Sequence, residues 1–532
     1  MKLTSIIIFS IGTFLLAANV KGQKAFIQSD RIYYAVGERV SGAGKVPANG
    51  DAINSAAIKW ELFGSEDEPY YSFFTVFDMN GWTSFDFNLP YNMTSGVYDL
   101  IGTVSVDFNV IELFTLQLSV VNPATEWKDS MALRANKMPI VDEIIDNWYS
   151  IQTNGDGEVI SVETIRDLKL LTISVCEAET NPYPNLEISN VQDEIWLGCA
   201  NWSRELWFYG KTQRFKKPTA VNIIGIYSNE ADSMKMTKSN QDGIFKTFMP
   251  TFYGTRHYQA IAHGDFENKI SYSAYTPSTK IKRNEDTNDS LGHIYYKLSQ
   301  VRQSVKTYFS IFDPVNKMKD TFLTQSLPKA QKTYKIANYN KFDLLRDFCR
   351  ENDSPLKFKE KKDRWNAEFL IPGAYAKKFN ALAQNPLFIV NGRLAMNDQL
   401  ISSLKTKDIE RVDLFYDLEE LRGVYSVFGT EGVVKIKSGG RLDCWDEKEL
   451  KEIFNVQGLL IKERSRTEII EDKIRRGLKP VLEPCLMFED REPQSKLRIY
   501  RGDEKSDFHI FGIFVDTNGK LYSAKAVLPA KQ

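Results

Sequence analysis

Histidine and the usual catalytic signatures are scarce in this chain of 532 residues. The four histidines are His257, His263, His293 and His509. None of them falls in an HExxH motif or in another zinc-ligand spacing, and no CxxC, GxSxG or P-loop pattern occurs. We therefore expect that the protein is not an enzyme and has no catalytic or cofactor-binding residues. We expect His257 and His263 to be half-buried structural residues.

An excess of either charge is also absent. The chain has 68 Lys and Arg residues against 69 Asp and Glu residues, which gives a formal net charge of −1. A nucleic-acid-binding protein usually has a basic excess or a basic stripe, so we expect no nucleic acid among the partners. Beyond the N-terminus no apolar segment reaches the ~20 residues that a spanning helix needs. We expect a protein that is peripheral to a membrane.

The N-terminus has the pattern of a secretory signal peptide over residues 1–22. Lys2 precedes an apolar run from Ile6 to Leu16, and Val20-Lys21-Gly22 is a candidate cleavage site before Gln23. The alternative is a short membrane anchor, although the run is shorter than a spanning helix. We expect an exported protein that is periplasmic, associated with the outer membrane or exposed on the cell surface.

The five cysteines are Cys176, Cys199, Cys349, Cys444 and Cys485. Export permits disulfides, and Cys176 and Cys199 are the nearest pair along the chain. Buried unpaired thiols are the alternative. So few cysteines in so long a chain exclude a scaffold held together mainly by disulfides.

Short aromatic and β-branched runs separated by turn signals predict strands over residues 23–123. The segment Ser29–Glu38 reads SDRIYYAVGE, and Phe85, Phe87 and Leu89 alternate before Pro90. These two segments resemble the opening and closing motifs of macroglobulin-type (MG2-like) domains. The resemblance implies a β-sandwich.

Residues 124–214 show apolar residues at helical spacing, from Ile140 to Trp148 and from Val162 to Leu171. We expect a helical or mixed connecting domain. The loop between these runs resembles a calcium-binding EF-hand loop, in which Asn154, Asp156 and Glu163 would be ligands. Gln152 stands where that family has its first Asp. We favour a glycine-rich connection between two helices, and a calcium site is the alternative.

Residues 215–277 return to strand patterns. The segment Ser239–Phe245 resembles a motif of carboxypeptidase-regulatory-like domains, which implies an Ig-like sandwich. Residues 278–333 read as a polar linker followed by a helix from His293 to about Tyr308. We expect this helix to pack beside the domain that follows it.

Three motifs in residues 334–441 resemble the plug domain of TonB-dependent receptors. They are Asn385–Arg393, Lys407–Leu414 and Tyr425–Lys437. A helix is predicted before them, over Phe342–Phe348. Within the motifs, Leu387, Ile389, Val412 and Leu414 are predicted strand residues, Asn391-Gly392 a hairpin turn, and Gly429 and Gly432 bends before the last strand.

A plugged transporter barrel takes about 22 strands of ~9–11 residues each. The segment from Arg441 to Gln532 is too short for such a barrel, so we expect a plug-like module without one. Residues 442–532 are predicted to form a closing β-sandwich. The order of modules resembles that of exported proteins of the Bacteroidota.

The predicted fold class is multidomain and mainly β, with Ig-like and macroglobulin-type sandwiches, a helical segment and an α+β plug-like domain. The resemblance implies a non-catalytic cell-envelope protein that binds other outer-membrane or surface proteins, as a structural subunit of a complex. The alternative is an accessory protein of TonB-linked nutrient uptake that binds a small ligand or a receptor.

Overall fold

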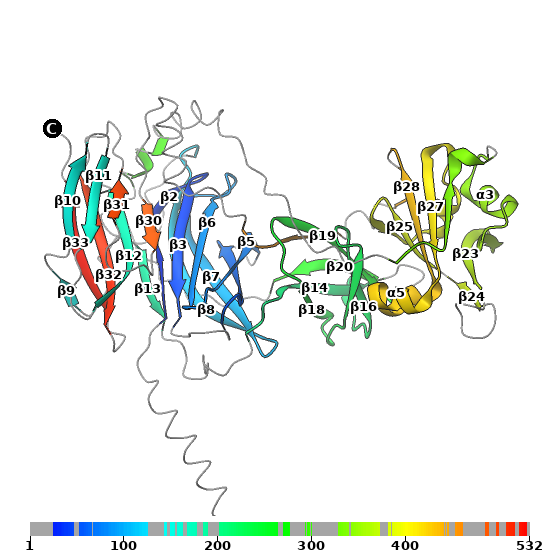
Figure 1. Cartoon of the computed structure of the whole chain (residues 1–532), viewed down its shortest axis with the longest axis horizontal. Coiled ribbons are helices and arrows are strands. Elements are labelled where there is room, and N and C mark those ends of the chain that lie inside the picture. The colour runs from blue at the N-terminus through cyan, green and yellow to red at the C-terminus, as the bar shows by residue number, and fades with distance from the viewer. Residues whose placement is uncertain are drawn as a thin grey trace, which may run out of the picture. The chain divides into compact units, whose positions relative to one another are not determined.

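A computed structural model describes the protein in two compact units, each discontinuous in the sequence (Figure 1). Unit 1 comprises Met1–Arg204, Thr279–Met318 and Leu459–Gln532, and unit 2 comprises Glu205–Ser278 and Lys319–Gly458. The described residues are 25–46, 53–65, 68–125, 202–263, 270–276, 328–339, 342–372, 386–440 and 453–460, with short stretches within 143–189, 293–300, 381–384, 442–445 and 485–528. The signal peptide expected at residues 1–22 lies outside them.

The N-terminal part of unit 1 is a β-sandwich. Its strands are β1 (Ala25–Ser29), β2 (Tyr33–Ala35), β3 (Arg39–Lys45), β4 (Ala57–Phe63), β5 (Pro69–Val76), β6 (Trp82–Asn88), β7 (Gly96–Val106), β8 (Asn109–Val121) and β13 (Asn185–Ser189). One sheet has the order β13-β1-β3-β6 and the other β2-β8-β7-β4-β5. The predicted alternation of Phe85, Phe87 and Leu89 is confirmed, since all three are buried. Their core surrounds Trp60, whose ring lies 4.8 Å from that of Phe85.

The prediction of helices within residues 124–214 is wrong where the structure describes this region, because the described elements are strands. It contains β9 (Glu143–Ile145), β10 (Tyr149–Asn154), β11 (Gly157–Val162) and β12 (Leu168–Glu177). The register of β12 shifts between Leu170 and Thr172, where the strand pairs with a C-terminal strand. Such an irregularity interrupts the strict alternation of a strand, and it coincides with the adjacent apolar residues Leu170 and Leu171 at the end of the second predicted helical run.

The separate C-terminal sandwich expected for residues 442–532 is also wrong. The strands β30 (Cys485–Phe488), β31 (Lys496–Ile499), β32 (Phe508–Asp516) and β33 (Leu521–Leu528) complete two sheets begun by residues 143–177. The orders of these sheets are β30-β12-β32-β33-β9 and β10-β11-β31. Figure 1 draws the orange and red strands beside the cyan ones. The connecting region and the C-terminal region therefore build their sheets together.

A second sandwich opens unit 2. Its strands are β14 (Leu206–Arg214), β15 (Lys217–Pro218), β16 (Ile224–Ser228), β17 (Ser233–Thr237), β18 (Ile244–Met249), β19 (Thr255–Ala262), β20 (Ile270–Tyr275) and β29 (Ile453–Gln457). β14 pairs with β15, β18 and β20, and the other sheet has the order β17-β16-β19-β29. The predicted boundary at Phe215 is too late, because β14 precedes it. β29 comes from the region that was expected to form the C-terminal sandwich.

The remainder of unit 2 is an α+β module. Its main sheet has the order β21-β27-β28-β25-β26, and β22-β23-β24 form a smaller one. The strands are β21 (Lys332–Lys335), β22 (Leu356–Lys361), β23 (Arg364–Ile371), β24 (Ala381–Gln384), β25 (Leu387–Val390), β26 (Arg393–Ala395), β27 (Ile409–Phe415) and β28 (Val433–Ser438). The helices are α3 (Leu345–Glu351), α4 (Asp398–Ser402) and α5 (Leu418–Tyr425), with the 3-10 turns η2 (Ile336–Asn338), η3 (Thr406–Asp408) and η4 (Ser426–Glu431). The helix predicted over Phe342–Phe348 is shifted, since α3 begins at Leu345.

The motif residues of this module take the local structure predicted for them. The four predicted strand residues lie in β25 and β27. Asn391 and Gly392 have φ values of 46° and 78°, as a tight hairpin between β25 and β26 requires. Gly432 has a φ of 87°, and a Cβ atom there would lie 2.9 Å from the ring of Phe369. Glycine is therefore favoured where the chain bends into β28.

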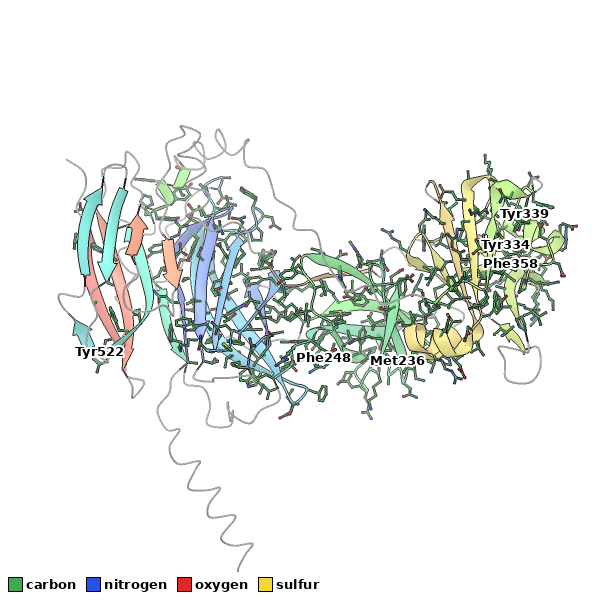
Figure 2. All side chains as sticks on the ribbon, in the orientation of Figure 1. Met236, Phe248, Tyr334, Tyr339, Phe358 and Tyr522 are labelled. Carbon is green, nitrogen blue, oxygen red and sulfur yellow. The ribbon has the colours of Figure 1, made fainter. Side chains whose placement is uncertain are left out.

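Aromatic rings join the parts of the α+β module, where Figure 2 labels Tyr334, Tyr339 and Phe358. The ring of Tyr334 lies 5.7 Å from that of Tyr339 and 5.5 Å from that of Phe348 on α3. Phe358 of β22 stacks on Phe388 of β25. These contacts hold α3 and the smaller sheet against the main sheet.

The segment predicted to begin a helix at His293 is helical at its described positions up to residue 300. Tyr295 and Tyr296 pack with Tyr33 and Val121 of the N-terminal sandwich. The described part of this helix thus packs on the N-terminal sandwich, and its expected packing beside the following domain stays a prediction. In the part of the chain that the structure describes, no helix has the length and hydrophobicity needed to cross a membrane.

Candidate functional site

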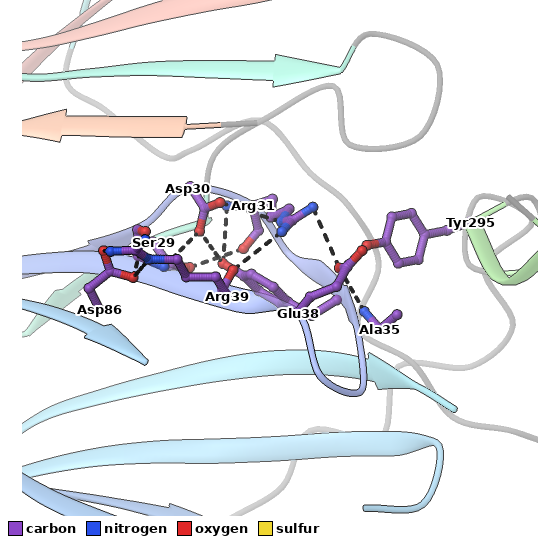
Figure 3. Close-up of polar contacts among 10 residues, drawn as sticks. Ser29, Asp30, Arg31, Ala35, Glu38, Arg39, Asp86 and Tyr295 are labelled. Atoms are coloured by element: carbon purple, nitrogen blue, oxygen red, sulfur yellow. Dashed lines mark hydrogen bonds and ion pairs between the residues drawn. The ribbon is translucent and has the colours of Figure 1, made fainter. Parts of the chain in front are cut away.

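The SDRIYYAVGE segment folds into a closed polar cluster in unit 1, which we call the Arg31 cluster (Figure 3). Arg31 is 3% exposed. Its guanidinium lies 3.4 Å from an oxygen of Asp30 and 3.5 Å from one of Glu38. It also lies 4.8 Å from the ring of Tyr34, whose hydroxyl donates a 2.7 Å hydrogen bond to Asp30. The charged motif residues therefore compensate one another.

Charge and burial shift the pKa values in this cluster. Burial disfavours the charge on Arg31, but Glu38, Tyr295 and Asp30 outweigh it and raise the pKa of the guanidinium. Burial and the nearby charge of Asp30 raise the pKa of Tyr34 well above its usual value. Both side chains thus keep their protons near neutral pH. This arrangement stabilises the turn between β2 and β3 and its surroundings.

Glu38 links the Arg31 cluster to a distant segment. One of its carboxylate oxygens accepts the N–H of Ala35 at 2.9 Å and the hydroxyl of Tyr295 at 2.5 Å. Tyr295 also stacks on Tyr33, with ring centroids 5.9 Å apart. The segment that contains Tyr295 is therefore fastened to the N-terminal sandwich by a charged hydrogen bond and by apolar contact.

A second polar group, which we call the Asp232 junction, joins the two modules of unit 2. The hydroxyls of Tyr227 and Tyr425 donate hydrogen bonds of 3.0 and 2.9 Å to one oxygen of Asp232. The other oxygen forms an ion pair with Lys435. Tyr227 and Asp232 belong to the sandwich, whereas Tyr425 and Lys435 belong to the α+β module. One carboxylate thus receives three donors from two modules.

The Asp232 junction combines an unusual backbone with aromatic packing. Asp232 has a φ of 48°, a left-handed conformation that Asp and Asn adopt more readily than most residues. Burial raises the pKa values of Tyr227 and Tyr425 far above the usual value, and the charge of Asp232 raises them further. Lys435 lies 4.8 Å from the ring of Phe415. The ion pair is therefore partly enclosed by aromatic rings.

Apolar packing surrounds this junction and spans both modules. Its buried members are Tyr227, Met234, Leu387, Ile389, Leu394, Phe415, Leu421, Val424, Tyr425, Phe428 and Val433. Beside it, the side chain of Gln259 accepts the N–H of Leu394 at 2.8 Å. Trp445 donates to the carbonyl oxygen of the same residue at 2.9 Å. The two modules of unit 2 therefore pack as one body.

The two histidines singled out in the sequence, His257 and His263, belong to neither polar cluster. His257 and His263 are exposed, so their predicted half-burial is wrong. His257 Nδ1 lies 2.7 Å from an oxygen of Glu230, and His263 packs against Phe428. In the described part of the chain, no group of three His, Cys, Asp or Glu residues is placed to hold a metal ion.

The predicted calcium loop takes a different structure from an EF-hand. Asn154 ends β10 and pairs with Gly157 at the start of β11, which makes a β-hairpin where flanking helices were expected. Asp156, Glu163 and Cys199 lie outside the described residues, so neither alternative for Cys176 and Cys199, a disulfide or unpaired thiols, is tested. Cys349 is a buried free thiol, and burial raises its pKa to about 12.

Sequence reasoning missed the long-range contacts that hold both clusters together, and it missed Asp232 and Tyr295 as members of them. Asp232 and Tyr425 are 193 residues apart, and Glu38 and Tyr295 are 257 apart. Neither pair has a local pattern that would link its members. An Asp in the short turn between two strands was the only available signal for Asp232, and it indicates a turn rather than a junction.

Comparisons with known proteins return structural neighbours but no family. No protein-family model matches the chain, and no curated protein matches it. Among solved structures, the chain is similar to Salmonella alpha-2-macroglobulin reacted with methylamine, with 9% identity and a TM-score of 0.22 over 96% of this chain. It is also similar to Escherichia coli alpha-2-macroglobulin activated by porcine elastase, with 10% identity and a TM-score of 0.22 over 95% of this chain.

The chain spans 39% of the Salmonella protein and 43% of the Escherichia coli protein. At such TM-scores these similarities support no conclusion about activity or partners. The predicted fold class, multidomain and mainly β, is confirmed by the strands and sheets of the structure itself.

Proposed function

We propose that this chain is a non-catalytic protein of the cell envelope that binds other outer-membrane or surface proteins, as a structural subunit of an outer-membrane complex. The predicted signal peptide supports export to the periplasm, the outer membrane or the cell surface. The three plug-like motifs support an outer-membrane context, and the strands that they contain, β25, β27 and β28, lie in one sheet.

The observation that carries this proposal is the Asp232 junction. A binding scaffold gains affinity when its surfaces are held in one arrangement before the partner arrives. The junction and its apolar core hold a sandwich and an α+β module together in that way. The polar groups of the junction bind one another, as expected of a structural contact that holds two modules together.

Strand addition is the mode of binding that the architecture favours. Sheet edges offer backbone groups to an incoming strand. The chain already uses this mode on itself, because β13 adds to β1 and β29 adds to β19 after long excursions. In the described part of unit 2, β17 and β29 end one sheet and β21 and β26 end another, and these edges are candidates to receive a strand from a partner.

Crosslinking in intact cells followed by affinity capture tests the proposal. We expect the tagged chain to recover one outer-membrane or surface protein in stoichiometric amount. The variant Asp232→Ala is compared with the wild type. It removes the contacts of the junction and should lower the amount of envelope protein that is recovered. Recovery of no envelope protein by the wild-type chain would contradict the proposal.

The alternative function is an accessory role in TonB-linked nutrient uptake, with a small ligand or a receptor bound by the α+β module. The presence of all three plug-like motifs in one sheet is what favours it. A thermal shift of the purified protein with a glycan, siderophore or peptide would support this role. Unchanged melting with all three would count against it.

A further inference from the structure

The turn between β14 and β15 carries an exposed aromatic residue in a strained conformation. Arg214 pairs with Lys217, which leaves Phe215 and Lys216 as the two turn residues. Their φ values are 51° and 64°. Such turns favour Asn and Gly, because other side chains are strained in the left-handed region. A phenylalanine at this position is therefore unfavourable for the fold itself.

This turn is also strongly basic. Phe215 is 78% exposed, and Arg214, Lys216 and Lys217 around it are exposed as well. The guanidinium of Arg214 lies 5.7 Å from the ring. The sequence contains no Asp or Glu between Glu205 and Glu230. We call the four residues Arg214–Lys217 the basic tip.

The hairpin between β7 and β8 provides a comparison within the same chain. Its turn residues Asp107 and Phe108 have φ values of 47° and 64°. Phe108 is also 78% exposed. Its neighbours in the sequence are Asp107 and Asn109, so this tip has the same aromatic exposure without the cations. Comparison of the two turns therefore distinguishes the contribution of an exposed aromatic ring from that of the neighbouring basic side chains.

We propose that the basic tip contacts a membrane surface that carries anionic phospholipid, with Phe215 inserted among the headgroups. Arg214, Lys216 and Lys217 would lie against the lipid phosphates. Basic residues are attracted to such a surface, and aromatic rings partition into the interface between headgroups and acyl chains.

A membrane suits this tip better than an acidic protein does. A stable protein interface buries about 800 Å² on each partner, far more than four residues at a protruding turn provide. Mobile lipid headgroups can instead arrange themselves around one ring and three separate cations. The contact is weak by itself, and it would complement the proposed binding to envelope proteins.

Vesicle sedimentation with the purified protein tests this contact without any partner protein, so its outcome is independent of the proposed function. The vesicles are phosphatidylcholine alone or phosphatidylcholine with phosphatidylglycerol. We expect binding that requires phosphatidylglycerol and declines at high salt. Each lysine near an anionic surface contributes about fivefold to the partition coefficient, so the double variant Lys216→Gln/Lys217→Gln should bind about 25-fold more weakly.

The variant Phe215→Asn separates insertion from misfolding. Asn is favoured in this turn, so the variant should fold at least as well as the wild type while it binds vesicles less. Phe108→Asn is the matched control and should bind as the wild type does. Equal binding to both vesicle types, full binding by Phe215→Asn, or absence of vesicle binding by the wild type would overturn the proposal. If the wild type binds no vesicles, the crosslinking experiment in intact cells is repeated with Lys216→Gln/Lys217→Gln. Loss of the crosslinked protein in that variant would indicate that the basic tip binds an acidic protein.

Discussion

Tyr425 donates a 2.9 Å hydrogen bond to Asp232 although 193 residues separate them. The bond joins the end of α5 to the turn between β16 and β17. Asp232 accepts a second hydroxyl, from Tyr227, and pairs with Lys435. The carboxylate of Asp232 thereby links the sandwich and the α+β module of unit 2, which the sequence presents as separate.

Replacing Asp232 by Ala should destabilise unit 2 by about 2–4 kcal/mol, because Lys435 and two tyrosine hydroxyls lose their partner. Denaturant unfolding of the purified protein, followed by tryptophan fluorescence, measures this change. The control Asp232→Asn keeps the left-handed turn and an acceptor oxygen, so it should lower the free energy of unfolding by less than Asp232→Ala does. If hydrogen exchange increased in β16 but not in β28, the conclusion that the two modules pack as one body would be wrong.

Asp398 should make stability depend on pH. Burial raises the pKa of its carboxyl to about 6, although the N–H of Ala367, which it accepts at 2.8 Å, acts in the opposite direction. Because the pKa of this carboxyl is higher in the folded than in the unfolded state, protonation of Asp398 favours folding. This contribution to the free energy of unfolding is fully present below about pH 4 and is lost as pH rises through about 6. Asp398→Asn should therefore increase stability at pH 7.5 by about 1–3 kcal/mol.

Unfolding curves at several pH values between about 4 and 8 measure the effect of Asp398→Asn. Its difference from the wild type should disappear at the acid end of this range, where the wild-type carboxyl is protonated. Asp408→Asn, at an exposed position on a neighbouring 3-10 turn, is the comparison variant. A constant difference between Asp398→Asn and the wild type across this range would show that protonation of Asp398 is not the cause.

Tyr295→Phe should release the segment around residue 295 from the N-terminal sandwich. The variant removes the hydroxyl that donates to Glu38 but keeps the stacking on Tyr33. The loss of a hydrogen bond to a charged group costs about 1.5–3 kcal/mol. Hydrogen exchange of the peptide that contains Tyr295 should become faster, with little change in unit 2. Unchanged exchange in that peptide would show that the hydroxyl does not fasten the segment.

Removing residues 461–532 should leave β12 without its neighbours β30 and β32. Limited proteolysis with mass spectrometry should then detect cleavage within residues 149–177, whereas unit 2 stays protected. The full-length chain digested in parallel is the control. Equal protection of residues 149–177 in both proteins would mean that these strands do not depend on the C-terminal region.

Local features were predictable where a residue type answers a local requirement. The turn at Asn391-Gly392 needs two left-handed residues, and Phe85 and Phe87 alternate on a strand with one buried face. These predictions depended on neighbours in the sequence only.

Pairings between distant segments were not predictable in the same way. The apolar residues from Leu168 to Leu171 fit a helix or an irregular strand, and the pairing of β12 with β32 decides between them. That partner strand begins at Phe508, near the other end of the chain. The Asp232 junction has the same property, since nothing near Asp232 in the sequence indicates Tyr425 or Lys435. Long-range pairing therefore determined what the local patterns left open.

Site-specific photo-crosslinking in living cells tests the proposed role most directly. A photoreactive amino acid would replace the exposed residues Met236, Tyr253 and Leu370 of unit 2, and the buried Phe369 would be the control position. We predict an adduct with one outer-membrane or surface protein from at least one exposed position and none from Phe369. If none of the exposed positions gave an adduct with an envelope protein, the account of this chain as an envelope-binding scaffold would be contradicted.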